Sequence, residues 1–277
     1  MSYKTILVEL DDSNTAEIRI GIASSLAAED AHVVGAVLAG NVAQTPRDGD
    51  LSAEAGIPEE ANQRFRRVAD CLGIRSIETR TIDGDVANAM SVQGCYCDLL
   101  VLGQDPGRGE TMSQHVDFLE YVVLNAGCPV LVVPERQMRI GVEARVGSHV
   151  LVGWNASRSA GRAVRDAMPV LVRASRVDLM VINAGNGKGG QGKQGLRGEE
   201  PGADIALFLT RHGVNVQVVQ LIVDEEAGKT MLSFADRLSS NLIVAGGMAH
   251  PHAGRLLTGG ATRTLLEHAH LPVLMSH

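Results

Sequence analysis

The sequence predicts an α/β protein made of two tandem, doubly wound domains, each with a five-stranded parallel sheet flanked by helices. Three observations lead to this fold class. The chain carries an internal repeat, its most apolar segments are short runs without polar alternation, and helical patterns separate those runs. Short apolar runs are typical of strands that are buried on both faces of a parallel sheet. Strands that alternate with helices form right-handed βαβ units, which build a doubly wound sheet.

The internal repeat consists of three segments that recur in the same order. The pairs are 6–13 (ILVELDDS) with 150–157 (VLVGWNAS), 98–103 (DLLVLG) with 241–246 (NLIVAG), and 128–133 (CPVLVV) with 271–276 (LPVLMS). The paired segments lie 144, 143 and 143 positions apart. Three collinear matches at nearly one offset indicate a duplication.

The duplication places one domain in each half of the chain. We predict the first domain at residues 1–137 and the second at residues 148–277. Residues 135–147 mix charged and short apolar residues and are interpreted as a connector. Each half then has roughly 130–140 residues, which is an ordinary domain size.

Strands and helices are expected to alternate in each half. The predicted strands lie near residues 4–10, 32–38, 76–82, 98–102 and 129–133 in the first half, and near 148–154, 176–182, 215–222, 241–245 and 272–276 in the second. Helical patterns cover residues 14–28, 59–72 and 224–238. The first opens with a capping-box-like sequence from Asn14 to Glu17, and the second has one charged and one apolar side. Ligands of such sheets bind beyond the carboxyl ends of the strands.

Composition and charge restrict the functions that the chain can have. Its formal net charge is −7 and its pI is about 5.7, which argues against nucleic acid as a partner because phosphate backbones need a basic face. No apolar run reaches the roughly 20 residues that span a bilayer, so no membrane partner is expected. The first residues lack a secretory pattern, and we expect a cytoplasmic protein. The four cysteines are interpreted as buried, reduced thiols, with a redox or metal pair at Cys95 and Cys97 as the alternative.

The segment after the fourth strand of the second half has the strongest binding signal. It begins at Gly246, contains Gly259 and Gly260, and leads into a helical pattern with Thr262 near its start. Glycines allow the backbone to approach a phosphate closely, and a helix N-terminus offers free N–H groups to an anion. The segment is therefore a candidate phosphate-binding loop.

This segment resembles the nucleotide loop of the universal stress proteins. That family carries G-x2-G-x9-G-(S/T) between its fourth strand and its last helix, ahead of a Pro-Val-Leu-Val strand. Here Gly246 and Gly259 hold the first and third glycine positions, and the stretches that start at Thr262 and Leu271 look like a tandem branch of the family. The resemblance covers both halves and implies an adenine nucleotide alpha hydrolase-like fold. It also implies ATP or another adenine nucleotide as ligand, with no metal beyond the Mg²⁺ that accompanies ATP.

The second half departs from the family pattern at two loop positions. Ala249 replaces the second glycine, and Gly260 replaces the serine or threonine whose hydroxyl donates to phosphate. A lost hydrogen bond to a charged group weakens binding by roughly 10- to 100-fold, unless Thr258 or Thr262 compensates. At the end of the first strand, where the family has an aspartate, this half has Asn155. The predicted nucleotide-binding residues are Asn155, Gly246, Gly259, Gly260 and Thr262.

The first half departs further from the pattern. It keeps Asp11 at the end of its first strand, but only Gly103 matches the loop. Asp105 and Glu110 repel phosphate, and Pro106 lacks a backbone donor. We therefore expect at most one nucleotide per chain, in the second half. At both strand ends, a helix-entry turn beside a capping serine is the open alternative to ligand contact.

Two other constellations carry weaker signals. Residues 185–202 match G-x-G-x-x-G and G-x4-G-K, but Gln194 follows the lysine where a P-loop needs serine or threonine, and the next helical pattern begins only near Ala203. We interpret this stretch as a mobile loop. Five histidines near the C-terminus are interpreted as solvated, with a zinc site as the alternative. They are His250, His252, His268, His270 and His277.

Together these features predict a stress-response protein of the universal stress type. We expect a regulatory, adenine-nucleotide-binding protein rather than an enzyme, and assign no catalytic residues, because no Ser-His-Asp order or carboxylate pair stands out. A scaffold protein with vestigial loops is the main alternative, and a weak ATPase is the third hypothesis. The resemblance also implies that the two halves form an internal pseudo-dimer through their last strands, and that two chains can form a homodimer.

Overall fold

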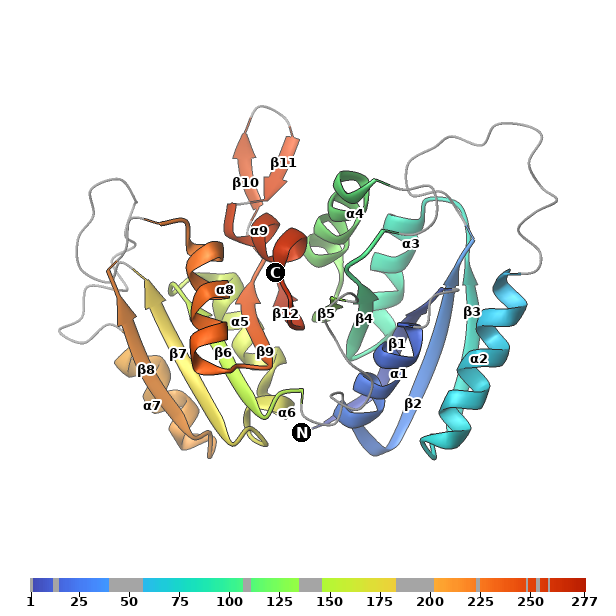
Figure 1. Cartoon of the computed structure of the whole chain (residues 1–277), viewed down its shortest axis with the longest axis horizontal. Helices are drawn as coiled ribbons and strands as arrows, with labels where there is room; N and C mark the ends of the chain where they lie inside the picture. The colour runs from blue at the N-terminus through green and yellow to red at the C-terminus, as the bar shows by residue number, and fades with distance from the viewer. Residues whose placement is uncertain are drawn as a thin grey trace. The chain divides into compact units, whose positions relative to one another are not determined.

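A computed structural model describes residues 2–11, 15–39, 57–106, 111–134, 146–182, 202–222, 225–247, 249–252, 255–258 and 260–277. The chain divides into two compact units, Met1–Ala144 and Arg145–His277 (Figure 1). Each unit is an α/β structure built on a parallel sheet. Among the described helices, none is both long and apolar enough to cross a bilayer.

The first unit alternates strands and helices along the chain. Its elements are β1 (Tyr3–Leu10), α1 (Ala16–Leu26), β2 (Ala27–Leu38), α2 (Ile57–Cys71), β3 (Ser76–Ile82), α3 (Val86–Gln93), the 3-10 helix η1 (Gly94–Tyr96), β4 (Leu99–Gly103), α4 (Met112–Asn125) and β5 (Val130–Val133). Its described strands are parallel and lie in the order β3-β2-β1-β4-β5.

The second unit repeats this plan. Its elements are β6 (His149–Trp154), α5 (Arg158–Asp166), α6 (Met168–Leu171), β7 (Arg176–Ile182), α7 (Ala203–Arg211), β8 (Val216–Leu221), α8 (Ala227–Leu238), β9 (Leu242–Gly246), β10 (Ala249–His252), β11 (Arg255–Thr258), α9 (Gly260–His268) and β12 (Val273–Ser276). The parallel strands lie in the order β8-β7-β6-β9-β12. Each has the neighbours within the unit that its counterpart has in the first, so the tandem doubly wound fold is confirmed.

The strands are buried as their sequences require. Every residue of β4, β5 and β12 is buried. Such strands form continuous apolar runs because helices cover both faces of a doubly wound sheet. The strands β3 and β8, which each have only one neighbour among the described strands of the sheet, carry exposed residues along their length.

One matched polar residue fixes the start of the central strand in each unit. Oδ2 of Asp98 accepts hydrogen bonds from the backbone N–H groups of Lys4, at 2.7 Å, and Thr5, at 2.9 Å. Oδ1 of its counterpart, Asn241, accepts from two backbone N–H groups around the start of β6, at 3.0 and 3.1 Å. Both tasks need only an acceptor oxygen, which aspartate and asparagine share. The duplication therefore extends to individual hydrogen bonds.

The first helix differs from its predicted bounds. The pattern at 14–28 predicts a longer helix than α1, which ends at Leu26 because the backbone of Ala27 is extended and begins β2. Thr15, the residue before α1, makes no side-chain cap hydrogen bond. Asn14, the first residue of the predicted capping box, lies outside the described residues, as do residues 185–201.

The two units differ most between the fourth strand and the last helix. In the first unit α4 has 14 residues and begins with a capping box between Thr111 and Gln114. In the second unit the chain forms the antiparallel hairpin β10–β11 before α9, which has nine residues. Sequence analysis identified only a loop here, because residues 249–258 lack the polar alternation of a typical hairpin.

Candidate functional site

The candidate site lies at the carboxyl edge of each sheet. In each unit the second and third parallel strands lie on one side of the central strand, β1 or β6, and the fourth and fifth lie on the other side, so the strand order reverses direction there. Such a switch point opens a crevice at the carboxyl ends of the strands, where doubly wound sheets bind ligands. The hairpin β10–β11 extends from this edge in the second unit (Figure 1).

A cluster of ionisable side chains fills this edge of the first unit. We call Glu9, Asp11, Arg19 and His115 the buried charge cluster. The Arg19 side chain on α1 is 0% exposed, and its Nε donates to the backbone carbonyl of Glu9 at 3.0 Å. Its Nη2 donates to Oδ2 of Asp11 at 2.6 Å. A guanidinium that is removed from water requires such partners, because desolvating a charge is costly.

Glu9 places its carboxyl group at the last residue of β4. Its Oε2 accepts the backbone N–H of Gly103 at 2.8 Å, and Nε2 of His115 lies 3.0 Å from the Gly103 carbonyl oxygen. Burial is the largest influence on Glu9 and raises the pKa of its carboxyl group. The charges of Arg19 and His115 and the Gly103 N–H lower this pKa, but by less. The charge of Asp11 adds to the rise.

The buried charge cluster bears on phosphate binding in the first unit. Gly103 is the one loop residue of this half that matches the family pattern, and its N–H already has a carboxylate acceptor. A phosphate at the same N–H would have to displace the carboxyl group of Glu9, which already accepts this hydrogen bond. The cluster therefore supports the expectation that the first unit binds no nucleotide, which stays a prediction.

The raised pKa of Glu9 predicts a pH dependence of stability. Between about pH 4.3, the pKa of an unperturbed glutamate, and the higher native pKa, Glu9 keeps its proton in the folded state only. The folded state then binds more protons, so the free energy of unfolding falls as the pH rises through this window, by at most about 1.4 kcal/mol per pH unit. Glu9→Gln has no proton to lose and should flatten the profile measured by urea denaturation. Glu29→Gln, at an exposed position of β2, should keep the wild-type slope, and equal slopes in the two variants would contradict the prediction.

The second unit lacks these charges at the corresponding positions. At the 144-residue offset, the counterparts of Glu9, Asp11 and Arg19 are Gly153, Asn155 and Ala163. A Cβ on Gly153 would meet Cε of Met231 at 2.6 Å, so the thioether end of Met231 covers this glycine. Where the first unit has an ion pair between the buried Arg19 and the partly exposed Asp11, the second has apolar packing next to an exposed asparagine.

Asn155 takes part in the turn that enters α5. Its Oδ1 accepts the backbone N–H of Ser157 at 3.0 Å, and the intervening Ala156 has a left-handed φ of 54°. Ser157 caps α5 by accepting the N–H of Ala160 at 3.1 Å. The helix-entry turn that sequence analysis left open is therefore present. Asn155 is also exposed, and ligand contact by its amide stays a prediction.

Gly246 ends β9 in close contact with α5. A Cβ at this position would lie 2.5 Å from the backbone N of Ala160 and 2.6 Å from the carbonyl carbon of Ser159. Only glycine lets the strand and the helix backbone approach so closely. Gly246 thus has a packing role that its place in the loop pattern does not reveal, and its contact with phosphate stays a prediction.

The start of α9 carries two more of the predicted residues. Gly260 is its first residue and is exposed, and the atoms nearest to a Cβ there would belong to the Glu226 side chain, at 3.6 Å or more. Thr262 is buried, so its hydroxyl does not face solvent. Gly259, the third glycine of the pattern, lies outside the described residues.

Glu226, which no sequence pattern singles out, lies beside α9. Its Oε1 accepts the N–H of Gly228 at 2.9 Å and its Oε2 that of Lys229 at 3.3 Å, so it caps α8. The hydroxyl of Thr264 on α9 also donates to Oε2, at 3.0 Å. A carboxylate therefore lies next to the N-terminal end of α9, where the phosphate loop is predicted. The only sequence signal is an acidic residue at the start of the helical pattern 224–238, which does not reveal the contact with α9.

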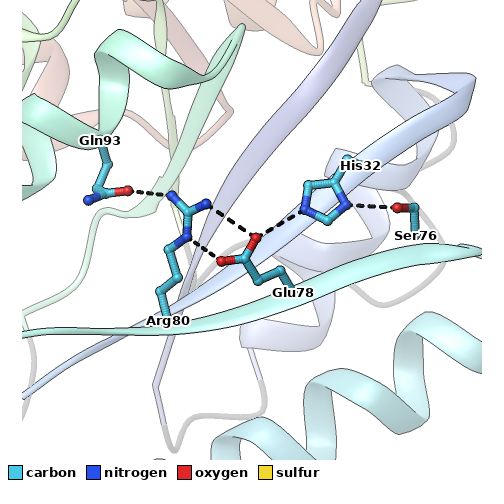
Figure 2. A network of polar contacts seen from close by, with 5 residues as sticks. All are labelled: His32, Ser76, Glu78, Arg80 and Gln93. Atoms are coloured by element: carbon cyan, nitrogen blue, oxygen red, sulfur yellow. Dashed lines mark hydrogen bonds and ion pairs between the residues drawn. The ribbon is translucent and has the colours of Figure 1, made fainter.

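A separate polar network joins β2, β3 and α3 (Figure 2). Nδ1 of His32 lies 2.8 Å from Oγ of Ser76, and its Nε2 lies 3.4 Å from Oε2 of Glu78. Arg80 donates to both carboxylate oxygens of Glu78, at 2.7 and 3.2 Å, and to Oε1 of Gln93 at 2.6 Å. The hydrogen bonds from Arg80 are the main reason that the pKa of Glu78 is lowered.

This network contains a serine, a histidine and a carboxylate but does not lie at the ligand-binding edge. Ser76 is the first residue of β3 and pairs with His32 across the parallel ladder, at the amino end of that strand. Glu78 is held by a guanidinium rather than aligned on the histidine alone. We interpret the network as a cross-strand tie that secures β3 to β2 and α3.

Two of the C-terminal histidines that are described make polar contacts within the second unit. Nε2 of His270 lies 2.5 Å from Oδ1 of Asp236, and Nδ1 of His277 lies 2.9 Å from the carbonyl oxygen of Gly247. His268 is exposed. In the described part of the chain, no group of three or more histidine, cysteine, aspartate or glutamate residues is arranged to hold a metal ion. The side chains at 250 and 252 are outside that part.

Comparison with known proteins gives matches in structure but not in sequence. No family profile and no curated protein matches the chain. The crystal structure of a universal stress protein from Archaeoglobus fulgidus DSM 4304 matches with a TM-score of 0.68 and 16% identity, over 98% of this chain and 95% of that one. A protein of unknown function from Pseudomonas aeruginosa PAO1 matches with a TM-score of 0.58 and 14% identity, over 99% and 92% of the two chains.

Proposed function

Because the chain has the fold of the universal stress proteins along its whole length, we propose that it is a stress-response regulatory protein that binds one adenine nucleotide. The proposed site is the carboxyl edge of the second unit, and the proposed ligand is ATP with its Mg²⁺. The nucleotide would act as a regulatory ligand that changes the conformation or the partners of the protein, and not as a substrate. No catalytic step is assigned.

The contrast between the two carboxyl edges carries this proposal. In the first unit the carboxylate of Glu9 accepts the Gly103 N–H, and Arg19 and Asp11 lie beside it. In the second unit the corresponding positions are uncharged, among them Gly153 and Asn155. At these positions of the second unit, a phosphate would not have to displace a buried carboxyl group from a backbone N–H.

The proposed contacts in the second unit are mostly backbone groups. The first turn of α9, from Gly260 to Thr262, would offer its N–H groups and the positive end of the helix dipole to the phosphates. Because the Thr262 side chain is buried, we assign its N–H and not its hydroxyl to this role. The exposed Asn155 would contact the base or ribose. Gly246 and Gly259 would keep the loop backbone close to the ligand.

Glu226 offers the sharpest test of the proposed site. Its carboxylate lies near Gly260, where it would repel the phosphates. Glu226→Gln keeps an oxygen that can cap α8 but removes the charge, so it should tighten ATP binding by about five- to tenfold in a calorimetric titration. Gly260→Asp adds a charge at the same place and should weaken binding by about tenfold or more, although an acidic residue at a helix N-terminus does not destabilise the helix.

The matched control is Glu225→Gln, at the adjacent exposed position. It changes the net charge by the same amount and should leave the affinity within about twofold of the wild type, because an exposed charge farther away is screened by salt. If the two glutamine variants change the ATP affinity equally, the nucleotide does not bind next to α9. Turnover of ATP above background would revive the hypothesis of a weak ATPase.

A scaffold without nucleotide is the second candidate function. Two observations favour it: the carboxylate of Glu226 already lies at the N-terminal end of α9, and Gly246 is occupied by packing against α5. Two results together would establish this alternative. Titration of the wild-type protein with millimolar ATP releases no heat, and mass spectrometry after heat denaturation detects no ligand.

The assembly and the compartment belong to the same proposal. The resemblance to the family supports an internal pseudo-dimer of the two units, a homodimer of two chains and a cytoplasmic location. Light scattering on the purified chain distinguishes a monomer from a homodimer by mass.

A further inference from the structure

Cysteines of the first unit meet at the amino ends of β4 and β5. Cys95 lies in η1, Cys97 follows η1, and Cys128 lies in the turn between α4 and β5. Sγ of Cys97 lies 3.8 Å from Sγ of Cys128, although the residues are 31 positions apart. We propose that Cys97 and Cys128 form a reversible disulfide when the protein meets a peroxide, so that the pair is an oxidation-sensitive modification site.

Two glycines explain why these segments lie so close. A Cβ on Gly94 would lie 3.0 Å from Cβ of Ala126, and a Cβ on Gly127 would lie 3.3 Å from Cα and 3.4 Å from Sγ of Cys95. The segment η1 therefore packs directly on the turn that carries Cys128. An S–S bond is about 2.05 Å long, so the two sulfurs need to approach each other by only about 2 Å, which side-chain rotation and a small shift of the turn supply.

Cys97 is the sulfur that reacts first. It is partly exposed, whereas Cys128 is only 8% exposed. The hydrogen bond with Cys128 is the largest influence that lowers the pKa of the Cys97 thiol, and two backbone N–H groups lower it further. Burial and the Asp98 carboxylate act in the opposite direction. The thiolate is the nucleophilic form of cysteine, so this environment favours Cys97 as the attacking group.

The proposed reaction consumes one hydrogen peroxide. The Cys97 thiolate attacks one peroxide oxygen, the O–O bond breaks, and the departing hydroxide takes up a proton to become water. The product is a sulfenic acid on Cys97. The sulfur of Cys128 then attacks the sulfur of Cys97, the S–O bond breaks, and hydroxide leaves with the Cys128 proton as a second water. Two thiols are oxidised to one disulfide while one peroxide is reduced to two waters.

The disulfide has a measurable effect on stability. It joins the residue after η1 to the turn before β5 and closes a loop of roughly 30 residues, which restricts the unfolded chain. Oxidation should therefore raise the melting temperature by roughly 5–10 °C, and dithiothreitol should reverse the rise. A purely structural thiol pair would show neither change.

The test is peptide mapping of the full chain under non-reducing conditions after treatment with one equivalent of hydrogen peroxide. The expected product is a linked peptide that contains Cys97 and Cys128, while Cys71, exposed on α2, stays a thiol. Cys71→Ser should form the same link. In Cys128→Ser the reaction should stop at the sulfenic acid of Cys97, which dimedone captures. Serine differs from cysteine by one atom, and circular dichroism verifies that the variant is folded.

Three outcomes would overturn the proposal. The first is a linked peptide in which Cys95 replaces Cys97 or Cys128 as a partner. The second is wild-type protein in which Cys97 is oxidised beyond the sulfenic acid while Cys128 stays a thiol. The third is oxidation of Cys71 at the rate of Cys97, because that would show that the pair has no special reactivity.

Discussion

Replacing Arg19 with methionine is expected to lower the free energy of unfolding by about 3–5 kcal/mol, measured by urea denaturation followed by circular dichroism. Arg19 is fully buried and bridges the Glu9 carbonyl and the Asp11 carboxylate. Methionine fills a similar volume but leaves the buried Glu9 next to Asp11 without the cation. The loss should shrink at low pH, because Glu9 can then take up a proton and lose its charge.

Arg67→Met is the matched control for this prediction. The Arg67 side chain on α2 is 70% exposed and lies 3.4 Å from Glu17. An exposed ion pair contributes about 0–1 kcal/mol, so this variant should be nearly as stable as the wild type.

A double variant separates the charge left behind at Glu9 from lost packing. Glu9→Gln combined with Arg19→Met removes the buried ionisable carboxyl group together with the guanidinium, and it should cost less stability than Arg19→Met alone. If the double variant is instead less stable than the single one, the loss arises from packing and not from an uncompensated carboxylate.

Replacing Gly246 with alanine is expected to lower the free energy of unfolding of the second unit by about 2–3 kcal/mol. The added Cβ would lie 2.5 Å from the backbone N of Ala160 and 2.6 Å from the carbonyl carbon of Ser159. Backbone atoms cannot rotate away as a flexible side chain can, so β9 and α5 must separate. Trp154, the only tryptophan of the chain, ends β6 and reports the unfolding of this unit by fluorescence.

Gly161→Ala is the matched control on the same helix. Gly161 lies within α5, and a Cβ there would have no heavy atom within 4 Å. Alanine is the better helix former, so this variant should gain roughly 0.5–1 kcal/mol. If Gly246→Ala is as stable as the wild type, close packing against α5 does not explain the glycine. Phosphate access would then be the remaining explanation.

These two predictions rest on contacts that sequence patterns do not encode. An arginine among the apolar residues of α1 is expected to reach solvent, and only the tertiary structure shows that it ends between Glu9 and Asp11. The glycine pattern assigns Gly246 to a ligand, whereas the structure shows that Ser159 and Ala160, more than 80 positions earlier, lie against it. In both cases the deciding partner is far away in the sequence.

The sequence by itself determined the fold class, the duplication and the edge of each sheet at which the candidate site lies. Strand burial is a local property, because a strand covered on both faces must be apolar at every position, as β4 and β5 are. The equivalence of Asp98 and Asn241 could likewise be predicted, because a duplicated strand needs the same acceptor at its start.

Only the tertiary structure decided what each candidate residue touches. It placed Glu226 against Thr264 across 38 positions and Cys97 against Cys128 across 31, and it added the hairpin β10–β11 to the predicted loop. The physical reason is that hydrophobic periodicity specifies which face of an element is buried but not which element covers it. Charge pairs, close glycine contacts and thiol pairs depend on that second choice, which is made when helices pack on the sheet.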